Sequence, residues 1–197
     1  MYARVNTIFG AEGKVGAGVA RIERSDRDAV EAAAGNRGLT TLVDEWGGVI
    51  VLMSYWDDPG HASAAALTRA RESAASAADG DLVAENFEVI VADRSAAAAP
   101  GAVVRMTRVR LEPARLDSGL AFLREELVRR LSAAGLCGTE VLVDREAGTG
   151  LLVTTWTDQD SADRAEALLD VLGADAAARA GVSFPRSESY VLVRRSG

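Results

Sequence analysis

A fifteen-residue segment occurs twice in this chain, one hundred residues apart, and constrains the fold more than any other feature. Leu42–Trp56 reads LVDEWGGVIVLMSYW, and Leu142–Trp156 reads LVDREAGTGLLVTTW. Leu-Val-Asp opens both copies, a glycine holds the same place in both turns, and a tryptophan closes both. The match continues past the tryptophans, where Asp58 aligns with Asp158. A repeat at a fixed spacing predicts two copies of one folding unit.

The composition is that of a globular protein and excludes several classes of function. Of 197 residues, 48% are hydrophobic and 26% are charged. The net charge of −7 argues against a nucleic-acid partner, because phosphate contacts need clustered Lys and Arg. Cys137 is the only cysteine, so an intrachain disulfide is excluded. We expect a cytoplasmic protein with no membrane partner, since no secretory signal and no apolar run near the required ~18 residues is visible.

Hydrophobic periodicity and turn residues predict the same series of elements in each half of the chain. The first half has strand Tyr2–Phe9, a helix over Val15–Ala34 interrupted near Ser25, hairpin strands Leu39–Asp44 and Val49–Trp56, a helix from Asp58 to Ala78, and strand Phe87–Ala92. The second half has strand Val103–Arg110, helix Ser118–Ala134 capped by Gly135, hairpin strands Glu140–Asp144 and Leu151–Trp156, a helix capped by Asp158, and strand Tyr190–Arg194.

Each half therefore has the β-α-β-β-α-β order of a ferredoxin-like unit, and the fold class is α+β. We expect repeats at residues 1–94 and 103–197, joined by a linker of small residues at 95–102. Such a unit places both helices on one face of its sheet, and here the other face is apolar. An exposed apolar sheet drives association, so we expect the two sheets to cover each other as a pseudo-dimeric α+β barrel within one chain. Two separate domains are the alternative.

Three sequence features resemble the antibiotic biosynthesis monooxygenase family of dimeric α+β barrel proteins. They are a first strand with a central Asn (ARVNTIF), a hairpin ending in an apolar run to Trp56, and Trp-Asp-Asp before a helix. Both halves are covered, so the resemblance implies a tandem fusion of the family's usual homodimer, with a further homodimer as an option. It also implies a cofactor-independent monooxygenase whose partner is a small aromatic molecule of the anthrone or quinol type. The alternative is a non-catalytic small-molecule-binding or stress-related protein.

Asn6 is the first candidate catalytic residue, because oxygenases of this family often place a pocket Asn on the first strand. Its amide could bind a phenolate or a peroxide through hydrogen bonds. The alternative is an ordinary strand Asn that bonds a neighbour or faces water. Aligning Arg4 with Arg105 requires a one-residue slip, which puts Thr107 opposite Asn6. The two pockets are then not equivalent, and the first is the better candidate.

His61 is the only histidine and the second candidate catalytic residue. At a helix start it could act as a general base toward a phenol, or it could be a solvated surface residue. A single histidine does not make a metal site, so we expect none. Heme-degrading members use a His late in the second helix as the iron ligand. Residues 68–78 contain no His, Tyr or Cys, which argues against heme, and we expect no cofactor.

Four further residues are candidates for substrate binding. Trp56 could stack on an aromatic substrate, although a Trp found in both copies also suits a structural role in packing the sheet against its helix. Ser54 shares the face of Trp56 and could be a pocket group or a core hydroxyl. Arg4 could bind an anionic substrate oxygen, or it could have an edge or pairing role across the two units. Trp46, in the first hairpin turn only, could cover a pocket or contact another molecule.

Overall fold

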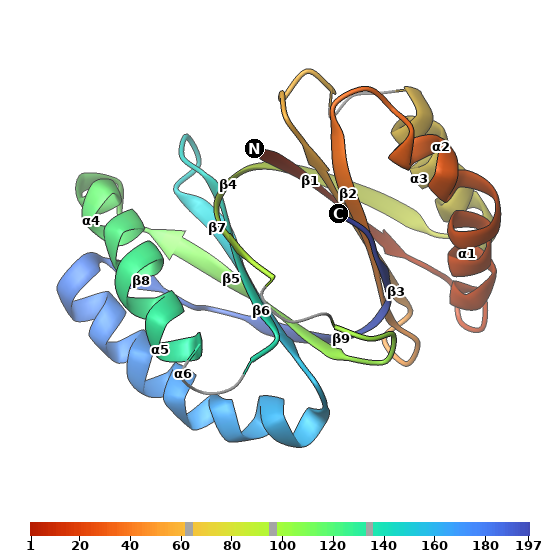
Figure 1. The fold of residues 1–197 in the computed structure, drawn as a ribbon. Coiled ribbons are helices and arrows are strands. Elements are labelled where there is room, and N and C mark those ends of the chain that lie inside the picture. Colours follow the sequence, from red (N-terminus) through yellow and green to blue (C-terminus); the bar gives the residue numbers. More distant parts are fainter. Residues whose placement is uncertain (62–64, 95–97, 133–135) are drawn as a thin grey trace. The chain divides into compact units, whose positions relative to one another are not determined.

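The computed structural model describes residues 1–61, 65–94, 98–132 and 136–197, which form two compact units. The first unit contains Met1–Phe87 together with Val191–Gly197, and the second contains Glu88–Tyr190. The predicted α+β class and the tandem β-α-β-β-α-β order are confirmed (Figure 1). The expectation that the two sheets cover each other stays a prediction.

The first unit is built from three central antiparallel strands with helices on one face (Figure 1). Its elements are β1 (Tyr2–Phe9), α1 (Val15–Arg21), α2 (Arg27–Glu31), β2 (Asn36–Asp44), β3 (Val49–Trp56), α3 (Ala65–Ala78) and the first part of β4 (Asp81–Asp93). A π-helical turn, Ile22–Asp26, joins α1 to α2 where the sequence predicts an interruption. The predicted helix start at Asp58 is wrong, because residues 57–60 form a bend and a turn in which Asp58 Oδ1 accepts the amide of Gly60 at 2.8 Å. Residues 62–64, before α3, lie outside the described residues.

The second unit repeats this arrangement. Its elements are β5 (Val103–Leu111), a short 3₁₀ turn (Pro113–Arg115), α4 (Leu116–Ala121), a π-helical turn (Phe122–Leu127), α5 (Val128–Ser132), β6 (Gly138–Asp144), β7 (Thr149–Trp156), α6 (Gln159–Ala180), β8 (Val182–Ser183) and β9 (Ser187–Arg195). Asp158 caps α6 as predicted, accepting a hydrogen bond from the Ser161 amide at 2.7 Å. The predicted helix end at Ala134 and Gly135 lies outside the described residues.

The two hairpin turns explain why the repeated segment keeps its Asp and its Gly. Asp44 Oδ1 accepts the amide of Gly47 at 2.8 Å, and Asp144 Oδ1 accepts two turn amides at 3.0 Å. Gly48 and Gly148 have φ values of +73° and +63°. Glycine adopts this left-handed conformation without the steric cost that a Cβ imposes. The sequence match at these positions therefore reflects the same turn chemistry.

Strand pairing does not follow the repeat boundaries at residues 94 and 103. In the first unit β2 pairs with the end of β9, with Val43 opposite Val191. In the second unit β6 pairs with the end of β4, with Leu142 opposite Val89. β4 and β9 are the last strands of the two repeats, so each unit is completed by residues from the other repeat.

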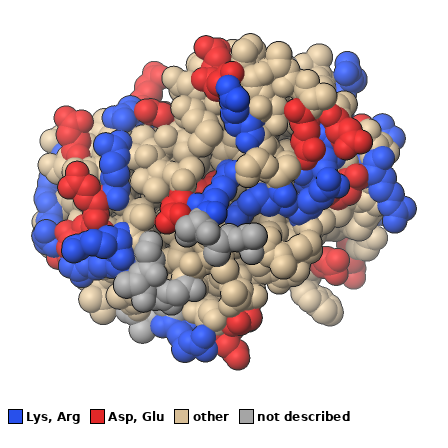
Figure 2. Space-filling model, viewed as in Figure 1, with Lys and Arg blue, Asp and Glu red and all other residues tan. Residues whose placement is uncertain are grey.

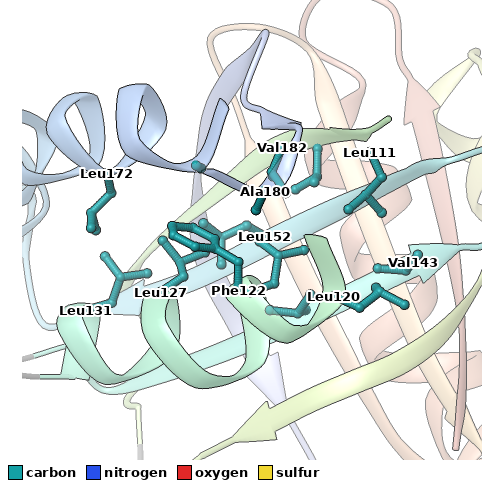
Figure 3. Close-up of a cluster of buried hydrophobic side chains, with 14 residues drawn as sticks. Leu111, Leu120, Phe122, Leu127, Leu131, Val143, Leu152, Leu172, Ala180 and Val182 are labelled. Atoms are coloured by element: carbon teal, nitrogen blue, oxygen red, sulfur yellow. The ribbon is translucent and has the colours of Figure 1, made fainter. Parts of the chain in front are cut away.

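The core of each unit lies between its helices and its sheet. In the second unit Leu120, Leu123, Leu127 and Leu131 pack with strand residues such as Leu152 (Figure 3). In the first unit two clusters form, one around Ile50 and Leu52 and one around Trp56. Most β1 and β3 residues on the helix-facing side are therefore buried, among them the polar residues Asn6 and Ser54.

Candidate functional site

The helix-facing side of β1 and β3 brings together four of the predicted site residues. The register places Arg4 opposite Ser54 and Asn6 opposite Leu52. Because side chains alternate along a strand, Arg4 and Asn6 share a face, as do Ser54 and Trp56. Trp56 packs against residues of α2 and α3, which identifies this face as the one toward the helices.

Asn6 is fully buried, and its amide is held by one hydrogen bond. Arg71 on α3 donates from Nη1 to Asn6 Oδ1 at 3.3 Å. A guanidinium can only donate, so the amide oxygen must face Arg71 and the amide nitrogen must point elsewhere. Within the described residues, Asn6 Nδ2 is a buried donor with no partner. A buried donor of this kind costs about 1–3 kcal/mol unless another molecule supplies the acceptor.

Arg4 adds a second guanidinium to this neighbourhood. It is partly buried on β1, two residues before Asn6. Burial, and after it the positive charge of Arg71, lowers the pKa of Arg4. The site therefore combines an amide donor with two cations, a set of groups that favours an anionic oxygen.

Trp56 and Ser54 form the wall beside this group. The Trp56 indole donates from Nε1 to Ser54 Oγ at 2.9 Å, and Ser54 Oγ donates to the main-chain oxygen of Arg4 at 3.3 Å. Both side chains are fully buried. Trp56 thus packs the sheet against its helices, and substrate contact by either residue stays a prediction.

The second unit has the same register but different chemistry. Arg105 lies opposite Thr154 and Thr107 lies opposite Leu152, so Thr107 occupies the place of Asn6, as the one-residue slip predicts. Arg105 Nη2 lies 2.6 Å from Asp163 Oδ1, and Thr107 Oγ1 lies 3.0 Å from Ser187 Oγ. Here the cation and the hydroxyl both have partners within the chain.

His61 and Trp46 lie outside this group. His61 Nδ1 lies 2.9 Å from Asp57 Oδ1, and Arg37 reaches the other Asp57 oxygen at 3.3 Å. The hydrogen bond from His61 is the main cause that lowers the pKa of Asp57. The His61 side chain is 48% exposed, and Trp46 at the hairpin tip is completely exposed. No contact described in the structure joins either residue to Asn6.

Two residues of these clusters were not predicted from the sequence. Arg71 lies in an Ala-rich helix, 65 residues from Asn6, and carries no motif. Asp57 stands in the Trp-Asp-Asp sequence, which does not by itself predict a role for it. A pattern of carboxylate and imidazole four residues apart at Asp57 and His61 is the one local signal that could have indicated a pair.

Other kinds of site find little support in the described residues. Among them no group of three His, Cys, Asp or Glu side chains could hold a metal ion, and no helix is long and apolar enough to cross a membrane. Basic and acidic side chains are interspersed on the face shown in Figure 2.

Two open cavities are described in the structure. One of about 580 Å³ lies beside α4 and α6, and one of about 290 Å³ lies beside Gly10. Neither is lined by a predicted site residue.

Comparison of the sequence with known proteins finds relatives but no matching family model. No family model matches the sequence. Two uncharacterized proteins of Mycobacterium tuberculosis are similar: Rv2557 is 27% identical over 83% of this chain and 75% of its own length, and Rv2558 is 28% identical over 75% and 64%.

Solved structures resemble the chain over nearly its whole length. A candidate monooxygenase from Fusobacterium nucleatum has a TM-score of 0.74 at 14% identity, covering 100% of this chain and 94% of that one. A second from Lactobacillus acidophilus has a TM-score of 0.71 at 11% identity, covering 98% and 93%. An anthrone oxidase-like protein has a TM-score of 0.66 at 14% identity, covering 99% and 92%. A ferredoxin-fold protein from Listeria monocytogenes that is related to antibiotic biosynthesis monooxygenases has a TM-score of 0.55 at 11% identity, covering 98% and 96%. The chain therefore has the ferredoxin-like fold of these proteins, which confirms the resemblance at the level of fold.

Proposed function

We propose that the protein is a cofactor-independent monooxygenase that acts on an aromatic small molecule of the anthrone or quinol type in its first unit. The observation that carries this proposal is the buried Asn6 amide, whose Nδ2 has no partner among the described residues. An acceptor oxygen on a substrate would satisfy this donor. Arg71 fixes the orientation of the amide, so the donor is ready before the substrate arrives.

In the proposed reaction the ionised substrate itself reacts with dioxygen, and the protein stabilises its negative charge. An anthrone becomes reactive toward dioxygen when it loses a proton, because the resulting carbanion can give up an electron. One oxygen atom of dioxygen replaces the two hydrogens of the methylene group as a carbonyl, and the other leaves as water with those two hydrogens. Asn6 would stabilise the negative oxygen of the ionised substrate by hydrogen bonding, and the cations of Arg4 and Arg71 would favour the same charge.

His61 is the candidate acceptor for the proton that the substrate loses. His61 is suited to proton transfer in chemical terms, and Asp57 orients its ring by a 2.9 Å contact. The pair lies on the surface, with no described contact to Asn6. The general-base role of His61 therefore stays a prediction, which His61→Ala tests independently of Asn6.

The proposal is tested with dithranol, a dihydroxyanthrone, under isotopically labelled dioxygen. We expect the corresponding anthraquinone with one labelled oxygen, formed faster than in buffer alone. Asn6→Ala should slow product formation, whereas Thr107→Ala, the matched change in the second unit, should not. Equal rates with wild-type protein and with buffer would refute the enzyme. If dithranol raises the melting temperature without product, the protein is the non-catalytic binder named as the alternative.

A further inference from the structure

Arg71 differs from three buried or partly buried arginines of this chain, each of which has a carboxylate partner. Arg27 pairs with Glu23 and Glu31, Arg94 with Glu140, and Arg105 with Asp163. Arg71 has no carboxylate partner within the described residues, and its one described hydrogen bond is to the neutral Asn6 amide. Its Nε is also buried without a partner. A guanidinium placed in this way is suited to bind an anion from outside the chain.

The second unpaired donor of the site lies next to it. The 3.3 Å distance between Arg71 Nη1 and Asn6 Oδ1 places the two head groups in contact, so Asn6 Nδ2 and Arg71 Nε are donors in the same small region. Asn6 is fully buried, whereas Arg71 is partly exposed. A ligand that approaches past Arg71 would meet the guanidinium first and the amide deeper inside.

We propose that this site recognises a hydroxyaromatic carboxylate, with Arg71 binding the carboxylate and Asn6 binding the adjacent phenolic oxygen, and that each chain holds one such molecule. The inference rests on the proposed function only in sharing its site. It narrows the proposed ligands from aromatic molecules of the anthrone or quinol type to hydroxyaromatic molecules that also carry a carboxylate. An ortho-hydroxy acid presents two neighbouring oxygens, which matches two neighbouring donors. Arg71 is then a specificity-determining residue.

The stoichiometry follows from the second unit. At the positions that match Arg4 and Asn6, Asp163 already pairs with Arg105 at 2.6 Å, and Ser187 already bonds Thr107 at 3.0 Å. One hundred residues after Arg71 stands Val171, which is exposed and carries no charge. An incoming carboxylate would find no arginine at the place of Arg71, and to bind Arg105 it would have to displace the negatively charged Asp163 carboxylate. The second unit is therefore closed to the ligand that the first unit accepts.

The test is calorimetric titration of the 197-residue chain with salicylate, with its neutral amide salicylamide, and with sulfate. We expect salicylate to bind at one site per chain and at least about tenfold more tightly than salicylamide, the change expected for losing a hydrogen bond to a charged group. Sulfate, which lacks the ring, should bind more weakly than salicylate. Arg71→Gln should weaken salicylate at least about tenfold and abolish its preference over salicylamide. Arg71→Lys, which keeps the charge, should retain part of that preference.

Arg105→Gln, which removes the buried strand arginine of the second unit, is the control and should leave salicylate affinity unchanged. Equal affinities for salicylate and salicylamide, two sites per chain, wild-type affinity in Arg71→Gln, or no salicylate binding at millimolar concentration would each overturn the proposal. If Arg71→Gln does not fold, the three-ligand comparison on wild-type protein still decides. Dithranol turnover without salicylate preference would refute this inference alone, and salicylate binding without any turnover would refute only the enzyme.

Discussion

The indole of Trp56 donates a hydrogen bond to Ser54 Oγ at 2.9 Å, two residues back on the same strand face. The second unit repeats this contact between Trp156 and Thr154 at 3.0 Å. Both indoles are fully buried, so each N–H needs its acceptor within the unit. A hydroxyl two residues before the tryptophan is thus a shared structural device, realised by Ser in one copy and Thr in the other.

Removing this hydroxyl should destabilise the first unit. Ser54→Ala leaves the Trp56 N–H buried without an acceptor, which costs about 1–3 kcal/mol. Ser54→Thr restores an acceptor of the type that the second unit uses, and should lie within about 1 kcal/mol of wild type. The free energy of unfolding in urea measures both. Equal stabilities of the Ala and Thr variants would contradict the hydrogen-bond account.

A larger loss is expected at Arg27, whose side chain is fully buried on α2. It pairs with Glu23 and Glu31 at 2.8 Å and donates to Thr41 Oγ1 at 2.8 Å. Arg27→Met leaves two carboxylates without their cation, which should cost about 3–5 kcal/mol of unfolding free energy. Arg24→Met, on the exposed side of the same helical segment, should change it by no more than about 0.5 kcal/mol. Similar urea midpoints for the two variants would rule out this role.

The same network predicts how stability depends on acid. Burial alone would raise the pKa of Glu31, but hydrogen bonds from Ser196 and Arg27 outweigh it, so its pKa in the folded protein is lowered. A lowered folded pKa contributes stability above the unfolded value of about 4.3, and this stability is lost as pH falls through the folded value. Glu31→Gln should therefore flatten the fall in unfolding free energy below about pH 4. An unchanged acid slope would show that Glu31 is not linked to folding.

The C-terminal residues should be required for the stability of the first unit. Ser196 N donates to Leu39 O at 3.0 Å, and Ser196 Oγ donates to Glu31 at 2.7 Å. Deleting Val191–Gly197 removes the strand that pairs with β2 and leaves its polar edge open. We expect amide exchange of β2 to accelerate strongly, measured by hydrogen exchange with mass spectrometry. Protection of β2 equal to that of the full chain would contradict the observed pairing.

Local and repeated features of the sequence predicted much of this fold. The repeat, the turn glycines and the strand alternation predicted the element order, and the one-residue slip predicted that Thr107 stands where Asn6 does. The pairing of β9 with β2 and of β4 with β6 could not be predicted, because pairing between distant segments leaves no local pattern. Arg27 was missed for a different reason: an Arg flanked four residues away by Glu23 and Glu31 has the pattern of an exposed helix surface. Arg71 contributes to its site only through a contact 65 residues away.

The central claim is that the Asn6 amide of the first unit carries the chemistry. The most direct measurement is the kcat/KM of dithranol oxidation for Asn6→Ala beside that for Thr107→Ala. Loss of one preorganised donor to a developing oxyanion should lower kcat/KM by about 10²-fold in the Asn6 variant and leave the Thr107 variant unchanged. Equal kcat/KM values for the two variants would contradict the account.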